Sequence, residues 1–106
     1  VVLLQVEADS PRVGAGFAIS AGEVVTARHL VLGAERVEIR DVDGQVRVGK
    51  VVGDDARADL AVVAVDGPAL VPAALGRAAS LRVGDALVAV GNPYGLGASV
   101  SVGVLG

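Results

Sequence analysis

Residues 22–65 contain the sole histidine of this chain and its clearest strand patterns. They read GEVVTARHLV (22–31), ERVEIRDVDGQVRVGKVVGDD (35–55) and ARADLAVVAV (56–65). β-Branched residues suit the pleated, half-buried surface of a sheet. The alternation of apolar and polar residues at 36–42 predicts a strand with one face in water. Asp43-Gly44 is a strong signal for a hairpin turn between this strand and the next.

Four strands are therefore expected within this segment. They span residues 24–26, 36–42, 45–52 and 60–65. Every position of 60–65 is apolar, which predicts a strand buried on both faces. Gly49 marks a candidate bulge. We expect one helical turn at 27–30 and a polar loop at 53–58.

Turn-forming residues separate four further strands outside this segment. These expected strands span residues 1–8, 13–20, 85–91 and 99–105. Gly14 and Gly16 indicate a sharp bend or a close approach of two backbones. Residues 92–97 are rich in Gly and Pro, which predicts a turn, and the alanine-rich residues 66–82 read as a linker. The pattern is all-β, and its first six strands describe a small antiparallel barrel or sandwich.

The composition limits the classes of function. A chain of 106 residues is the size of one domain, and with two aromatics and no Met or Trp its core must consist of Val, Leu, Ile and Ala. The net charge of -3, without a basic cluster, argues against nucleic acid or an anionic membrane as a partner. The absence of cysteine excludes disulfides and thiol chemistry. The longest apolar runs, of about six residues, are far short of the roughly 20 that cross a bilayer.

His29 and Asp59 are the candidate catalytic residues. They lie at the ends of two expected strands, which a closed barrel can bring to one rim. A hydroxyl nucleophile needs an imidazole as general base, and the imidazole needs a carboxylate that fixes its tautomer. Ser-His-Asp triads assemble these groups from positions distant in sequence. The alternative is that neither residue is catalytic. A lone histidine in a β protein is commonly a structural or surface residue, and an aspartate commonly marks the start of a buried strand.

Six short motifs follow one another across almost the whole chain. They are GAGFAIS (14–20), VVTARHLV (24–31), VVGD (51–54), DLAVV (59–63), LRVGD (81–85) and GNPYGLG (91–97). Together, and in this order, they resemble the HtrA/Deg family of trypsin-like serine proteases. The family often has Ser at Ala15 and Asn at Ala27, and Arg28 is bulkier than the residue usual before the histidine. None of these departures removes a proton-transfer group.

This resemblance implies both a fold and a function. The fold is an antiparallel six-stranded Greek-key barrel of trypsin-like type at residues 1–66, an inter-barrel linker at 67–84, and the opening hairpin of an incomplete second barrel at 85–106. The function is that of a serine endopeptidase, with His29 as catalytic base and Asp59 as the carboxylate that orients it. Such chemistry needs no metal and no organic cofactor.

The resemblance also implies partners and a compartment. The partners are unfolded or peptide substrates and the missing second barrel of the same protein, and a homo-oligomer is compatible with the family. An extracytoplasmic or membrane-tethered location is expected on the same ground.

No serine of this chain has the setting of a nucleophile. The serines are Ser10, Ser20, Ser80, Ser99 and Ser101. None lies in a Gly-x-Ser-Gly-Gly type of segment, in which a nucleophile and its backbone oxyanion donors are presented together. We therefore expect the serine outside this chain and no peptidase activity from the chain alone.

Two other interpretations stay open. The first is a catalytically inactive, protease-like barrel that binds peptides or proteins. A search of the parent gene for a serine in a glycine-rich turn would distinguish it from an active protease. The second is an unrelated small barrel with a structural role. That reading is favoured if His29 and Asp59 are not within hydrogen-bond reach.

Overall fold

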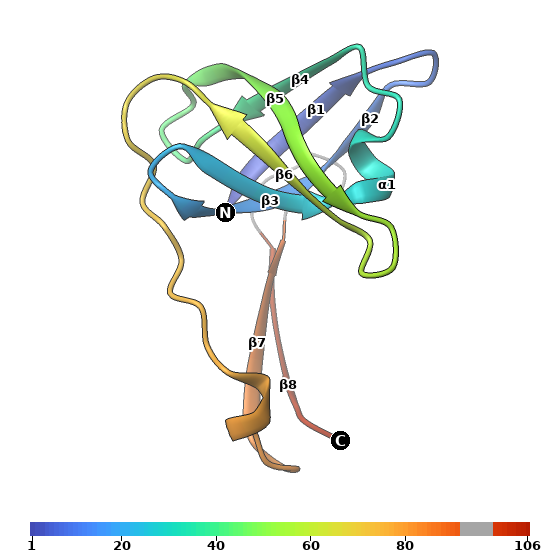
Figure 1. Cartoon of the computed structure of the whole chain (residues 1–106). Coiled ribbons are helices and arrows are strands. Elements are labelled where there is room, and N and C mark those ends of the chain that lie inside the picture. Colours follow the sequence, from blue (N-terminus) through green and yellow to red (C-terminus); the bar gives the residue numbers. More distant parts are fainter. Residues whose placement is uncertain (92–98) are drawn as a thin grey trace.

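Six strands close into an antiparallel barrel (Figure 1). The computed structural model of the protein describes residues 1–91 and 99–106. The strands of the barrel are β1 (Val2–Glu7), β2 (Arg12–Ser20), β3 (Glu23–Ala27), β4 (Arg36–Arg40), β5 (Val46–Asp55) and β6 (Leu60–Val65). They pair in the order β1-β2-β3-β6-β5-β4, and β1 pairs with β4 to close the ring. The predicted all-β fold with a six-stranded Greek-key barrel is confirmed.

Inward-pointing aliphatic side chains fill the barrel. Successive side chains of a strand point to opposite faces of the sheet, so the alternation in the sequence sends one set of residues inward. Leu4, Ile39 and Val63 have no exposed surface. The core consists of Val2, Leu4, Val6, Ala18, Val24, Leu30, Val31, Val37, Ile39, Ala61, Val63, Val65 and Leu70. Among residues 1–91 and 99–106, the core contains no aromatic residue.

Strand β6 has one buried face rather than two. Ala61, Val63 and Val65 are buried, whereas Leu60 at the start of the strand is 48% exposed. The expectation that this strand is buried on both faces is therefore wrong. A closed barrel has a single interior, and on the outer face of β6 Val62 and Ala64 are only half-buried.

Strand β5 is longer than expected, and its bulge lies elsewhere. Pairing with β6 continues to Asp55, so the first residues of the expected polar loop at 53–58 belong to a strand. The register shifts between Val51 and Gly53, which places the bulge beyond Gly49. A side chain at Gly49 would instead collide with the core.

The expected hairpin and the close approach of two backbones are both present. Gly44 adopts a positive φ of 83°, and its N–H donates a hydrogen bond to the Asp41 carbonyl at 3.0 Å. A Cβ at Gly16 would lie 2.8 Å from the carbonyl oxygen of Val25. Glycine at this position therefore lets β2 and β3 pack without a clash.

The chain leaves the barrel through residues 66–77, which we call the connector and which contain no helix or strand. Two backbone hydrogen bonds hold the connector to the barrel. Leu70 N–H donates to Ala21 O at 2.9 Å, and Ala73 N–H donates to Ala18 O at 2.8 Å. The Leu70 side chain is buried in the core.

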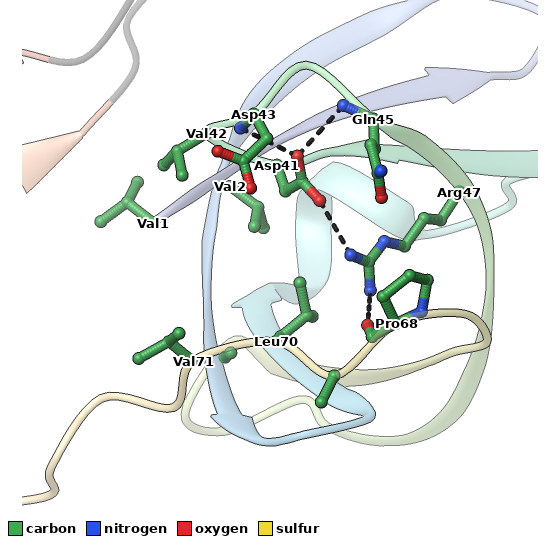
Figure 2. A pocket seen from close by; sticks show the side chains of 12 residues that line it. Val1, Val2, Asp41, Val42, Asp43, Gln45, Arg47, Pro68, Leu70 and Val71 are labelled. Carbon is green, nitrogen blue, oxygen red and sulfur yellow. Dashed lines mark hydrogen bonds and ion pairs between the residues drawn. The ribbon is translucent and has the colours of Figure 1, made fainter.

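A buried ion pair holds the same part of the connector (Figure 2). The Arg47 Nη2 lies 2.8 Å from Asp41 Oδ2, and the two side chains are only 8% and 9% exposed. The Nη1 of the same guanidinium donates to the carbonyl oxygen of Pro68. One arginine thus links the turn after β4 to the connector.

A two-stranded hairpin follows the connector and extends away from the barrel (Figure 1). A 3₁₀ turn, η1 (Ala78–Ser80), precedes β7 (Ala86–Gly91) and β8 (Ser99–Val104), which pair antiparallel. The expected turn at 92–97 lies outside the described residues. No helix of the described parts of the chain is long and apolar enough to cross a membrane.

Candidate active site

Pairing of β3 with β6 brings the two predicted site residues to one rim of the barrel. Ala27, the last residue of β3, pairs with Leu60, the first residue of β6. His29 follows Ala27 by two positions, and Asp59 immediately precedes Leu60. Antiparallel register therefore converts a separation of thirty residues into contact.

His29 and Asp59 make two hydrogen bonds. The His29 ring Nδ1 lies 2.5 Å from Asp59 Oδ2, and the backbone N–H of His29 donates to Asp59 Oδ1 at 2.9 Å. Both oxygens of one carboxylate thus bind one residue, through its ring and through its main chain. Among residues 1–91 and 99–106, the hydrogen bonds of the ring involve Nδ1 alone.

The backbone of Asp59 is held in an unusual conformation. Its φ of 54° makes it the one residue other than glycine with a positive φ in the described parts of the chain. Aspartate tolerates this left-handed region better than most residues, yet strain of this kind concentrates at functional sites. The Asp59 carbonyl also accepts a hydrogen bond from the Arg28 N–H at 3.0 Å, so the turn is tied to the start of the helix.

The contact with histidine stabilises the ionised form of Asp59. The hydrogen bond with the His29 side chain, followed by that from the His29 backbone N–H, lowers the pKa of Asp59 below its ordinary value of 3.8. Partial desolvation opposes this change, and the charges of His29 and Arg28 reinforce it. A carboxylate beside Nδ1 favours the tautomer with the proton on Nδ1, which leaves a lone pair on Nε2.

A short helix carries His29. The helix α1 (Arg28–Val31) is anchored by the buried side chains of Leu30 and Val31. The Arg28 Nε binds Asp54 Oδ2 at 2.6 Å, and Asp54 lies near the end of β5. The expected helical turn at 27–30 is confirmed one residue further along the chain.

Arg12 contacts helix α1, and this contact was not predicted from the sequence. Its Nη1 donates to the carbonyl oxygen of His29 at 2.7 Å, and its Nη2 donates to that of Leu32 at 2.6 Å. Contacts between a side chain and carbonyls 17 and 20 residues away leave no local pattern in a sequence.

The site is open to solvent. The His29 side chain is 76% exposed and that of Asp59 is 48% exposed. A cavity of about 240 Å³ lies against Asp59, with Phe17, Thr26, Leu60 and Val90 among its lining residues. It therefore connects the rim of the barrel with strand β7. A second cavity, of about 270 Å³, lies beside the Asp41–Arg47 pair (Figure 2), and neither His29 nor Asp59 lines it.

The described residues offer little to a metal ion. Within these parts of the chain, no three His, Cys, Asp or Glu side chains are grouped so that they could hold one. The chemistry of the rim is that of an imidazole and a carboxylate.

The structure is a closed barrel with a histidine and an aspartate hydrogen-bonded at its rim, and comparison with a family model gives the class of protein. The chain belongs to the trypsin-like peptidase domain family, whose model matches residues 14–106. Within that family its similarity is to the HtrA and Deg type of serine protease.

Named relatives and solved structures support this narrower placement. The chain is 42% identical to the putative serine protease HhoB of Synechocystis sp. over 87% of its own length and 22% of that protein. It is 41% identical to the periplasmic serine endoprotease DegP of Salmonella typhimurium over 87% of its length and 20% of that protein. The structure of the HtrA-type protease AlgW with a tripeptide superposes with a TM-score of 0.92 at 33% identity, covering 97% of this chain and 35% of AlgW. The chain thus spans about a fifth of the curated relatives.

Proposed function

We propose that this chain is the His- and Asp-bearing part of a serine endopeptidase, with His29 as catalytic base, Asp59 as the residue that orients it, and the nucleophilic serine outside the chain. The observation that carries the proposal is the pair of contacts between Asp59 and His29, 2.5 Å at the ring and 2.9 Å at the main chain. The family supports the reaction class.

The geometry suits a proton relay. As the serine hydroxyl attacks a peptide carbonyl, its proton passes to Nε2 of His29, and the carboxylate of Asp59 stabilises the resulting imidazolium. The proton then passes from Nε2 to the leaving amine, so the base returns to its neutral form. Water then attacks the acyl-enzyme and gives a proton to Nε2, and Nε2 passes this proton to the serine oxygen as the bond to the acyl group breaks and the carboxylic acid product leaves.

Residues 1–66 would be the first barrel, 67–84 the inter-barrel segment and 85–106 the opening hairpin of a second barrel. The hairpin supports this division because its valines are exposed: Val88, Val90, Val100, Val102 and Val104. Burying such a surface against further strands would be favourable. The substrates would be peptides or unfolded proteins. The location would be extracytoplasmic, because the relative DegP of Salmonella typhimurium is a periplasmic serine endoprotease.

The test compares the full-length protein with its His29→Ala variant on casein. The variant should lose several orders of magnitude in kcat, because triad members act as a unit. Circular dichroism and thermal melting of both proteins control for folding. Near-normal turnover by the variant would remove His29 from the mechanism.

Two further outcomes are informative. The isolated chain of 106 residues should not hydrolyse casein, and turnover that resists serine-directed inhibitors would contradict a serine mechanism. If the wild-type full-length protein binds casein fragments but does not cleave them, the barrel is a non-catalytic binding module.

A further inference from the structure

Arg12 connects the start of strand β2 to the residue that we assign as the catalytic base. It pairs with Val6 in the barrel, and its guanidinium reaches helix α1 on the rim. The two terminal nitrogens donate to the carbonyls of His29 and Leu32 at 2.7 and 2.6 Å. The Nε of this guanidinium is buried.

Helix α1 needs such a partner. The last carbonyls of any helix lack intrahelical donors, and α1 has only four residues. Arginine presents several N–H donors in a rigid planar fork, so one side chain can satisfy two carbonyls at a fixed separation.

The peptide groups on both sides of the His29 Cα are therefore held. Asp59 Oδ1 accepts from the His29 N–H at 2.9 Å, and Arg12 Nη1 donates to the His29 carbonyl at 2.7 Å. The remaining freedom is rotation of the side chain, which Asp59 Oδ2 restricts through Nδ1. Arg12 of β2 and Asp59, which immediately precedes β6, thus define where Nε2 lies.

We propose that Arg12 is a positioning residue for proton transfer at His29, an inference that rests on the proposed function. It acts through the main chain of His29 and touches no reacting atom. Loss of its two hydrogen bonds lets the C-terminal end of α1 shift, which moves Nε2 relative to the serine hydroxyl. Misplacement of a reacting group by about 1 Å can cost about 10²-fold in rate.

The test uses the full-length protein and four variants. Arg12→Met removes both hydrogen bonds and keeps most of the apolar stem, and Arg12→Lys retains a single cationic donor group. Arg36→Met is the matched control, because Arg36 is a half-exposed arginine of β4 whose ion pair is made with Glu38 of the same strand and not with α1. His29→Ala reports on the proposed function itself. Titration with an active-site serine inhibitor gives the concentration of folded, competent sites.

The expected result is a fall in kcat per active site of about 10- to 100-fold for Arg12→Met, with KM changed less than about twofold. Arg12→Lys should recover part of the rate, and Arg36→Met should match the wild type. A purely structural role would reduce the number of active sites and leave kcat per site unchanged, and that result would overturn the proposal.

A spectroscopic measurement separates failure of this inference from failure of the proposed function. With ¹⁵N-histidine labelling of the same full-length proteins, the spectrum of His29→Ala identifies the His29 ring signals. Arg12→Met should shift or broaden them, and Arg36→Met should not. If the wild type proves inactive, or if His29→Ala stays active, the proposed function fails. In that case the ring signals still show whether Arg12 positions the His29 side chain. Unchanged signals in Arg12→Met overturn the inference whatever the activity.

Discussion

Asp59 binds His29 at two points, with one oxygen on the ring Nδ1 at 2.5 Å and the other on the backbone N–H at 2.9 Å. The two hydrogen bonds have different effects. The bond to the main chain places α1 relative to β6, and the bond to the ring selects the orientation and tautomer of the imidazole. One carboxylate therefore couples the fold of the rim to the orientation and tautomer of the His29 imidazole.

Asp59→Asn should abolish most activity while leaving the fold intact. Asparagine tolerates the positive φ of this position and its carbonyl oxygen can still accept from the His29 N–H. Its amide would donate to Nδ1, which favours the tautomer with the proton on Nε2. We expect kcat of the full-length protein to fall about 10⁴-fold.

Asp55→Asn is the matched control for that change. Asp55 lies four residues earlier, and its Oδ1 accepts from the backbone N–H groups of Arg57 and Ala58, which asparagine can also do. The control should retain nearly the rate of the wild type. Equal losses in Asp55→Asn and Asp59→Asn would contradict a specific role for Asp59.

Acid should selectively remove the stabilising effect of Asp59. Because the native pKa lies below the ordinary value of 3.8, the ionised carboxylate contributes stability that is fully present above that value. The contribution is lost as the pH falls through the lowered native pKa. Urea unfolding of the wild type and Asp59→Asn should show a difference in unfolding free energy at pH 6 that shrinks below pH about 3.8. A difference that is constant with pH would contradict the link.

Gly16→Ala should destabilise the barrel. The new Cβ would lie 2.8 Å from the Val25 carbonyl oxygen and 2.9 Å from Val24 Cγ1, and the first of these is backbone that cannot rotate away. Overpacking of this kind costs about 1–3 kcal/mol in unfolding free energy. Gly53→Ala is the control, since nothing lies within 4 Å of its Cβ. Urea unfolding curves that place both variants together would refute the clash.

Arg47→Met should release the connector. The substitution removes the contact with the Pro68 carbonyl and leaves Asp41 as a buried carboxylate without its partner. Hydrogen exchange of the Leu70 and Ala73 amides, which bond to the barrel, should accelerate, and the melting temperature should fall.

Adding Asp41→Asn to Arg47→Met should restore part of the melting temperature, because an unpaired buried charge is worse than none. Arg36→Met, which breaks an exposed ion pair, should leave exchange of both amides unchanged. Unaltered exchange in Arg47→Met would show that the connector is held by Leu70 and the backbone bonds alone.

Much of the barrel follows from local pattern. Alternation at 36–42 predicted β4, and the turn at Asp43-Gly44 predicted the hairpin, because each depends on neighbouring residues only. The wrong prediction for β6 has a different cause, because it concerns contacts between distant parts of the chain. The apolar run of β6 resembles a strand with two buried faces, and only closure of the ring determined that its outer face stays partly exposed.

The features of the candidate site also fall into those that local pattern predicts and those that depend on the tertiary structure. By itself, the sequence determined that His29 and Asp59 stand at strand ends, because strand ends are marked by the local alternation and by turn residues. Tertiary structure alone decided that Ala27 pairs with Leu60, that Asp59 takes a positive φ, and that Arg12 reaches the carbonyl of His29. The physical reason is range: periodicity records which face a side chain occupies, whereas these contacts depend on the register and closure of strands far apart along the chain.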